Sequence, residues 1–377
     1  MITHMHCEGF KGINGKDFTF KPLTVLTGTN CSGKSSIIQS ILLARLAEQT
    51  AVSLGNRAAN SQENKTTIPL NGPFGLRLGA ASEVFSFDSS RKGEMQIAFD
   101  NGTKEFSFLF QSDDYNNRYL TCTIPPEFLF SHSTGSFTYI SAIREGQPDL
   151  LPMQSHPEST LEIGYRGEYA AEVLRVFEKR TVAEPLRHKD AGALPLTKQV
   201  EAWMGEFVPS VALRVETCSV LDAVGLRYLQ GGAESEWVRP SNTGFGLSYC
   251  LPIVVAGLLG SPGSTLIIDS PEAHLHPSAQ SAMGQFLARL AALGIQTIIE
   301  THSDHIINGI RLASLEKNHP FNGKDAQFHF LFRNESGLVS QAIEITPSGA
   351  LSHYPDAFFD QTEIDLRRIV EARRKDS

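Results

Sequence analysis

Cysteine is scarce in this chain, and no cysteine lies in the spacing of a metal site or a disulfide framework. Five are scattered over 377 residues without a CxxC pair, and an odd number does not suit paired bridges. They are Cys7, Cys31, Cys122, Cys218 and Cys250. This usage fits a reducing compartment, so we expect a cytoplasmic location.

An apolar run long enough to cross a membrane is also missing. The longest, residues 250–259, is about half of the ~20 residues that a membrane helix needs. The N-terminus has no charged leader followed by an apolar stretch, so we expect no export. Any membrane role would need a partner subunit.

Positive charge is not in excess, since 33 Lys and Arg against 41 Asp and Glu leave a formal charge of −8. The electrostatic field of a net negative charge repels nucleic acid, which argues against a protein that coats DNA through a general basic surface. A local basic groove is still compatible with this charge. The basic residues 367–368 and 373–375 fall on an expected C-terminal helix, where a solvated face is the simpler interpretation. Residues 187–189 either contact DNA or are only solvated.

Sustained heptads and solenoid repeats are absent, which excludes long coiled-coil arms and repeat architectures. Apolar residues make up 41% of the chain, enough for a large core in one domain or two close lobes. We therefore expect a folded protein without long coiled-coil extensions.

The first part of the chain alternates between strand, loop and helix signals. Residues 18–27 are typical of a strand, residues 35–48 have helical apolar spacing, and the polar residues 53–67 predict a surface loop. Within residues 74–142, short β runs such as 95–99 and 106–110 predict antiparallel hairpins.

The later part predicts two helices and then an alternating pattern. The expected helices are 169–177 and 198–207, followed by helix 245–259, strand 265–268, helix 279–293 and strand 295–299. Alternating buried strands and helices indicate an α/β fold with a mostly parallel sheet. We expect an N-terminal lobe over 1–150, a helical insert over 151–240 and a C-terminal lobe over 241–377.

Residues 28–35, GTNCSGKS, match the phosphate-binding pattern G-x-x-x-x-G-K-[ST] between a predicted strand and a predicted helix. Backbone amides of such a loop surround the β-phosphate, the lysine spans the β and γ oxygens, and the serine hydroxyl ligates Mg²⁺. The expected ATP-binding residues here are Gly28, Thr29, Asn30, Cys31, Ser32, Gly33, Lys34, Ser35 and Ser36. A metal-binding acid should end a second buried strand, and Asp269 does so.

Several segments together resemble ABC-type ATPases. They are the Walker A motif at 24–36, the Walker B motif with D-loop at 269–277, the histidine switch at 300–305, and the motifs at 139–144, 242–248 and 354–360. The chain is similar to small bacterial AAA/ABC-like ATPases grouped with overcoming-lysogenization-defect proteins and with the ATPase subunits of Septu-, Gabija- and retron-type anti-phage systems. The resemblance implies a P-loop ATPase head of the ABC/SMC type without a coiled coil.

The resemblance also implies a homodimer in which ATP lies between two heads. Asn242 and Gly244 would occupy the signature positions and face the γ-phosphate held by the other head, and His302 would sense that phosphate. A glycine-rich turn that opens a helix can bind an anion, although a simple helix cap explains Asn242 and Gly244 as well.

The chain departs from the ABC pattern at the catalytic glutamate. Ser270 stands directly after the Walker B acid, so we expect Glu272 to polarise the attacking water, with Glu300 as the alternative. No Q-loop glutamine is recognisable, which leaves the second Mg²⁺ contact unassigned.

A different metal site is a weaker alternative for the same region. His274, His276 and His305 with Asp304 match no standard zinc spacing, and the Walker interpretation already accounts for the segment.

We therefore expect an Mg-ATP-dependent dimerising ATPase that acts as sensor, switch or scaffold of an anti-phage defence complex. Since no separate nuclease motif is recognisable, a partner nuclease or toxin would supply the effector chemistry, and DNA binding stays open. Ser270 suits the alternative of a nucleotide-gated, SMC-type DNA-binding or repair protein with little hydrolysis. A transporter motor is disfavoured by the degenerate signature and the missing Q-loop.

Overall fold

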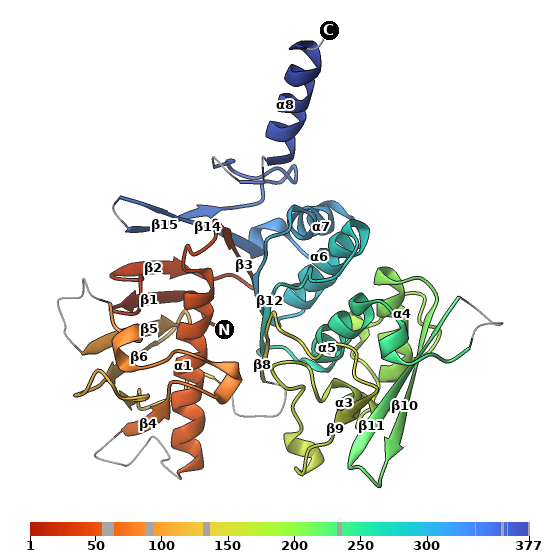
Figure 1. Cartoon of the computed structure of the whole chain (residues 1–377), viewed down its shortest axis with the longest axis horizontal. Helices are drawn as coiled ribbons and strands as arrows, with labels where there is room; N and C mark the ends of the chain where they lie inside the picture. The colour runs from red at the N-terminus through yellow and green to blue at the C-terminus, as the bar shows by residue number, and fades with distance from the viewer. Residues whose placement is uncertain are drawn as a thin grey trace.

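The computed structural model describes residues 1–54, 64–86, 93–130, 136–231, 236–335, 337–355, 358–359 and 361–375. These residues form three sheets and the helices that cover them (Figure 1). Within this part of the chain, the helices are all too short or too polar to cross a bilayer.

Six strands form a mixed central sheet in the order β15-β14-β3-β13-β12-β8. All neighbours pair in parallel except β15, which runs antiparallel to β14 at one edge. The strands are β3 (Leu23–Gly28), β8 (Phe137–Ile140), β12 (Thr265–Asp269), β13 (Gln296–Glu300), β14 (Ala326–Asn334) and β15 (Gly337–Ile343). Every residue of β13 is buried, as expected for a strand covered on both faces.

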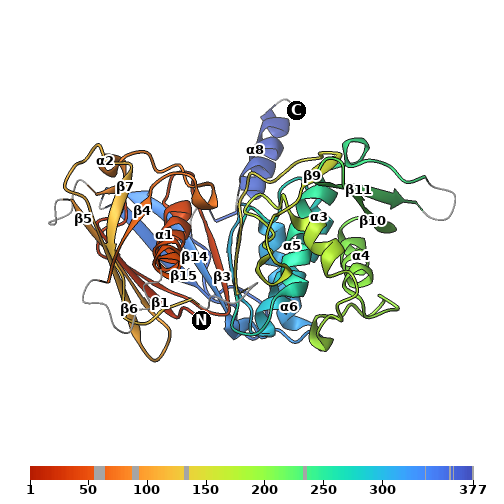
Figure 2. The same cartoon turned by 90° about the horizontal axis from the view of Figure 1, so that it is seen from below.

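A second, antiparallel sheet lies beside the central sheet, with strand order β2-β1-β5-β6-β7-β4. Its strands are β1 (His4–Glu8), β2 (Lys16–Thr19), β4 (Lys65–Pro69), β5 (Glu94–Asp100), β6 (Glu105–Gln111) and β7 (Tyr119–Thr123). Helix α1 (Lys34–Ser53) packs between the two sheets, because its apolar side chains share one core with both (Figures 1 and 2). The predicted hairpin of residues 95–99 and 106–110 is confirmed as β5 and β6.

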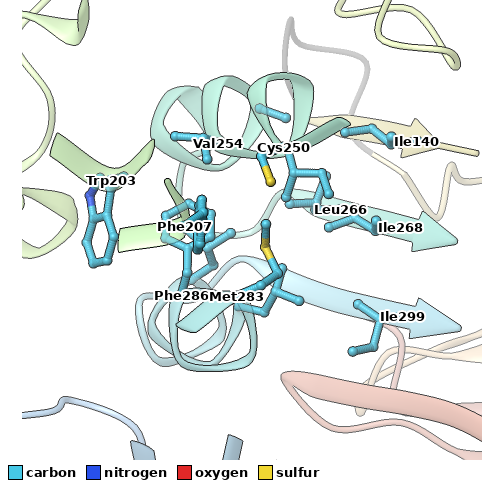
Figure 3. Close-up of a cluster of buried hydrophobic side chains, with 14 of the residues drawn as sticks. Ile140, Trp203, Phe207, Cys250, Val254, Leu266, Ile268, Met283, Phe286 and Ile299 are labelled. Carbon is cyan, nitrogen blue, oxygen red and sulfur yellow. The ribbon is translucent and has the colours of Figure 1, made fainter. Parts of the chain in front are cut away.

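A second core fills the other face of the central sheet. Figure 3 shows Val254, Met283 and Phe286 between the helices and the strands that carry Ile268 and Ile299. The helices on this side are α3 (Ala170–Val176), α4 (Leu196–Phe207), α5 (Phe245–Leu259), α6 (Pro277–Ala292) and α7 (Asp304–Leu315). The four helices predicted in these regions are confirmed, with ends displaced by at most two residues.

Three expectations were wrong in part. Residues 18–27 form two strands, β2 and β3, because the chain turns at Lys21 and Pro22. The loop expected over 53–67 lies mostly outside the described residues, but its end is strand β4, whose side chains alternate between exposed and buried. The insert over 151–240 is not only helical. It also contains part of a three-stranded antiparallel sheet of β9 (Leu150–Pro152), β10 (Val211–Cys218) and β11 (Ala223–Gln230).

The remaining elements are short, apart from the last helix. They are α2 (Ala81–Val84), η1 (Pro73–Gly75), η2 (Glu158–Thr160), η3 (Glu184–Leu186), η4 (Pro240–Asn242), η5 (Gly323–Asp325) and α8 (Gln361–Lys375). Helix α8 extends away from the sheets (Figure 1) and confirms the predicted C-terminal helix.

Phe286 provides a test of the second core. It is fully buried, and its ring centroid lies 5.0 Å from that of Trp203. We predict that Phe286→Ala lowers the free energy of unfolding by about 3–5 kcal/mol through lost burial and an added cavity. Urea unfolding, followed by Trp203 fluorescence in a Trp237→Phe background, measures the change. Leu312→Ala on the exposed side of α7 is the control and should change stability by less than about 0.5 kcal/mol.

Candidate nucleotide-binding site

The loop between β3 and α1 has the backbone geometry of a phosphate cradle. Gly28 has a φ of 133°, and a Cβ on it would overlap the Leu331 carbonyl of the neighbouring strand β14. The Thr29 amide donates to that same carbonyl at 3.0 Å. Gly33 caps α1 with a φ of 103°. Both positions therefore require glycine, and the loop is held against the sheet directly before the start of a helix.

Lys34 lies inside this loop, with 3% of the residue exposed. Its ammonium donates to the carbonyls of Gly28 at 3.1 Å and Thr29 at 2.8 Å. Burial lowers the pKa of Lys34, and the nearby Glu300 and Asp269 carboxylates oppose that change. The Lys34 ammonium is thus held at the loop where a phosphate would bind. The two carboxylates beside it could hold a metal ion that also contacts this phosphate.

The acids meet because of the strand register. Strands β12 and β13 are parallel, and Asp269 pairs directly with Glu300 at their carboxyl ends. The Ser35 hydroxyl, in the first turn of α1, donates to Glu300 Oε1 at 3.2 Å. The structure therefore places the two predicted metal ligands, Ser35 and Asp269, around the carboxylate of Glu300, the residue proposed only as an alternative catalyst.

The ionised forms of Asp269 and Glu300 are disfavoured by burial, and the two negative charges lie close to each other. Burial, followed by the neighbouring Asp269 charge, raises the pKa of Glu300 to about 7, although the Ser35 hydrogen bond and Lys34 act in the opposite direction. Burial also raises the pKa of Asp269. Glu300 Oε2 is buried and has no hydrogen-bond partner among the described residues.

These donors fit a magnesium ion. Mg²⁺ prefers oxygen ligands, and it would satisfy the orphaned Glu300 oxygen and offset the paired negative charges. Ser35, Asp269 and Glu300 would hold it. Bound there, it would neutralise charge on the β- and γ-phosphates of ATP.

Glu272 faces a different group. Its Oε2 accepts a hydrogen bond from the Thr301 hydroxyl at 2.7 Å, and its Oε1 accepts one from the His302 amide at 2.8 Å. Burial and the nearby Lys34 ammonium lower the pKa of His302, so its ring is neutral at neutral pH. Glu272 thus anchors the switch segment, residues 300–305, while the His302 ring stays accessible.

Asn242 ends η4 and Gly244 is the N-cap of α5, and both residues are exposed. Among the described residues, no hydrogen bond joins either of them to the phosphate loop or to the acids. The motif at 354–360 is described only at 354–355 and 358–359, where Phe358 packs against Phe330 of β14.

The alternative metal site has no support within the described ranges, which contain no metal-holding group of three His, Cys, Asp or Glu residues. His276 caps α6 through Ser278, and the His274 ring stacks on Phe245. Both side chains therefore have a structural role.

Arg144 is a site residue to which the sequence analysis gave no role. Its Nη2 donates to the main-chain carbonyls of Asp269 at 2.6 Å and Ser270 at 3.0 Å. Arg144 follows β8, which pairs in parallel with β12 and therefore ends at the same edge of the sheet. The signals in the sequence were the short β run Phe137–Ile140 and the motif at 139–144, which ends at Arg144, but the neighbour of this run in the sheet could not be identified.

Comparisons with known proteins agree with this geometry. Residues 23–308 match the profile of the family described as "AAA domain, putative AbiEii toxin, Type IV TA system". Residues 322–369 match a second profile, described as "Protein of unknown function (DUF3696)". No curated protein matches the chain.

The fold is similar to that of SMC heads. The SmcHead bound to the C-winged helix domain of ScpA has a TM-score of 0.51 at 11% identity over 91% of this chain and 98% of that one. An SMC head domain from Thermotoga maritima has a TM-score of 0.45 at 10% identity, over 92% of this chain and 99% of that one. An Smc head from Pyrococcus furiosus has a TM-score of 0.47 at 13% identity, over 99% of each chain. The predicted fold, a P-loop ATPase head of the ABC/SMC type, is confirmed.

The raised pKa of Glu300 predicts a stability cost that depends on pH. Because Glu300 holds its proton more tightly in the folded chain, the wild type loses stability as the pH rises from about 4.5 to about 7. Glu300→Gln should therefore be more stable than the wild type by up to about 3 kcal/mol at pH 8, and equally stable at pH 4.5. Urea unfolding without divalent ions tests this. Glu216→Gln, exposed on β10, is the control, and an equal pH dependence in both variants would contradict the explanation.

Proposed function

Because the chain belongs to the family described as AAA domain, putative AbiEii toxin, Type IV TA system, we propose that it is an Mg-ATP-dependent ATPase that dimerises around its nucleotide. The supporting observation is that Lys34, Ser35, Asp269 and Glu300 meet at the carboxyl end of the central sheet. A cation, a hydroxyl and two acids are what positioning and charge neutralisation of a triphosphate require.

The two glutamates have separate tasks in this proposal. Glu300 acts with Asp269 as a metal ligand, since it lies opposite Asp269 and has an oxygen without a partner among the described residues. Glu272 polarises the attacking water and aligns His302, whose amide it already binds. This division favours an active hydrolase over a binding module with little hydrolysis.

Phosphate release measured against Mg²⁺ concentration separates the two glutamates. Glu300→Gln should raise the Mg²⁺ concentration for half-maximal turnover by at least about 10-fold, because a metal ligand is lost. Glu272→Gln should leave that concentration unchanged and lower kcat by at least about 100-fold, because a group that acts on the water is lost. Lys34→Ala should abolish nucleotide binding. Full turnover in Glu272→Gln would assign the catalytic role to another residue.

We propose that the second half of each nucleotide site comes from a second copy. Asn242, at the end of η4, and Gly244, the N-cap of α5, are both exposed, and the amides of a helix start can bind a phosphate. Among the described residues, nothing lies within 4 Å of a Cβ built on Gly244, and its φ of −72° suits any residue. Gly244→Asp should therefore fold normally but place a negative charge against the γ-phosphate of the partner.

Sedimentation and mixing test this sharing of sites. Glu272→Gln should form an ATP-dependent dimer, and adding Gly244→Asp to it should prevent that dimer, whereas adding Gly244→Ala should not. The single variants Lys34→Ala and Gly244→Asp, each made in the wild-type background, should be inactive alone. An equal mixture of the two proteins should regain about a quarter of wild-type turnover, since half of the dimers are mixed and each mixed dimer has one intact site out of two. A mixture as inactive as its components would contradict sharing between copies.

We further propose that the closed dimer is the switch of a defence complex and that a partner nuclease or toxin delivers the effect. The family description names a putative toxin of a type IV toxin–antitoxin system, and a solved SMC head with this fold is bound to a domain of another protein. Affinity purification of Glu272→Gln with and without ATP tests the idea. A stoichiometric partner should be gained or lost with ATP, and a lone dimer in both conditions would contradict it.

A further inference from the structure

Residues 141–149 run from the edge of the nucleotide site to the start of α5. Arg144 binds the carbonyls of Asp269 and Ser270 at one end. Three residues later, the Gln147 amide donates to the Thr243 carbonyl, next to the proposed signature glycine. Arg144 and Gln147 of this segment therefore contact both the end of β12 and the turn directly before α5.

The Arg144 guanidinium is buried to an unusual degree. Only 2% of the residue is exposed, and Nε and Nη1 have no hydrogen-bond partner among the described residues. Removing such a charge from water is unfavourable unless nearby groups compensate. Two carbonyls, the ring of Tyr249 at 5.4 Å and the charges of Asp269 and Glu272 provide that compensation.

Ser270 shows what the guanidinium holds in place. Successive carbonyls of an extended strand point to opposite sides, yet those of Asp269 and Ser270 both accept from Nη2 of one arginine. The chain makes this possible by placing Ser270 at a φ of 53°, a left-handed conformation that is unfavourable for a non-glycine residue. The arginine therefore stabilises the turn that ends β12 directly after the metal-binding acid.

The same guanidinium is joined to α5 through aromatic rings. Tyr249 of α5 lies under Arg144 and makes an edge contact with His274 at 4.6 Å, and His274 stacks on Phe245 at 5.1 Å. Phe245 is the first residue of α5, directly after Gly244. A continuous set of contacts thus links the carbonyl of Asp269 to the helix end that would face the partner's phosphate.

We infer that Arg144 is a positioning residue: it sets the direction of the Asp269 carboxylate and, through Tyr249, couples that direction to the signature end of α5. This inference rests on the proposed function, because it assigns Arg144 to the hydrolysis step of that site. Arg144 touches neither Lys34 nor the phosphate loop in any described hydrogen bond. Its loss should therefore lower turnover much more than nucleotide affinity.

Turnover and ATP affinity of purified full-length variants test the inference. Arg144→Ala should lower kcat by at least about 30-fold and change the Kd of a fluorescent ATP analogue by less than about 3-fold. Arg144→Lys should recover part of kcat, since an ammonium can still bind the two carbonyls. Tyr249→Leu should lower kcat about 5-fold, and Tyr249→Phe, which keeps the ring, should match the wild type. Combining Arg144→Ala with Tyr249→Leu should add no further loss.

Arg214→Ala is the matched control, because Arg214 also lies over an aromatic ring, that of Trp237 at 4.3 Å, but on β10. It should leave kcat and Kd unchanged. Equal losses of kcat and affinity in Arg144→Ala, or no loss of kcat, would overturn the inference. If Arg144→Ala fails to fold, wild-type kcat in a folded Tyr249→Leu variant would overturn it. A wild-type protein without ATP turnover would instead overturn the proposed function.

Discussion

Two acids and one ammonium share the carboxyl end of the central parallel sheet, and their mutual electrostatics constrain most of the site. Lys34 is buried against carbonyls of its own loop, while Asp269 and Glu300 face each other across β12 and β13. Burial disfavours the charged forms of both the lysine and the acids. A bound polyanion would compensate the charge of Lys34, and a divalent cation would compensate the charges of Asp269 and Glu300.

The fold supplies this placement through two cores on opposite faces of one sheet. Helix α1 is packed between the central sheet and the antiparallel sheet, which fixes the direction of its N-terminus toward the phosphate loop. Helices α5 and α6 fill the other face and fix the residues that follow β12 and β13. The acids therefore sit on rigid strands, and the groups proposed to face a second copy sit on a helix end.

Contacts also connect these parts across the chain. Glu272 holds the switch segment through Thr301 and His302, and Arg144 holds the turn that follows Asp269. Each of these side chains binds main-chain atoms, so a shift of one strand end would be passed to its neighbour. This is the behaviour expected of a site in which nucleotide state and dimer contacts are coupled.

The local pattern of residues 28–35 was sufficient to predict the phosphate loop, and alternating buried strands and helices were sufficient for the fold class, because both depend on short-range spacing. Asp269 could be predicted in the same way. The positions of Glu300 and Arg144 could not be predicted, since they depend on which strands become neighbours. Strand β13 brings Glu300 opposite Asp269, and β8 brings Arg144 to the main-chain carbonyl of Asp269. Strand order is decided by long-range packing, which spacing within one segment does not encode.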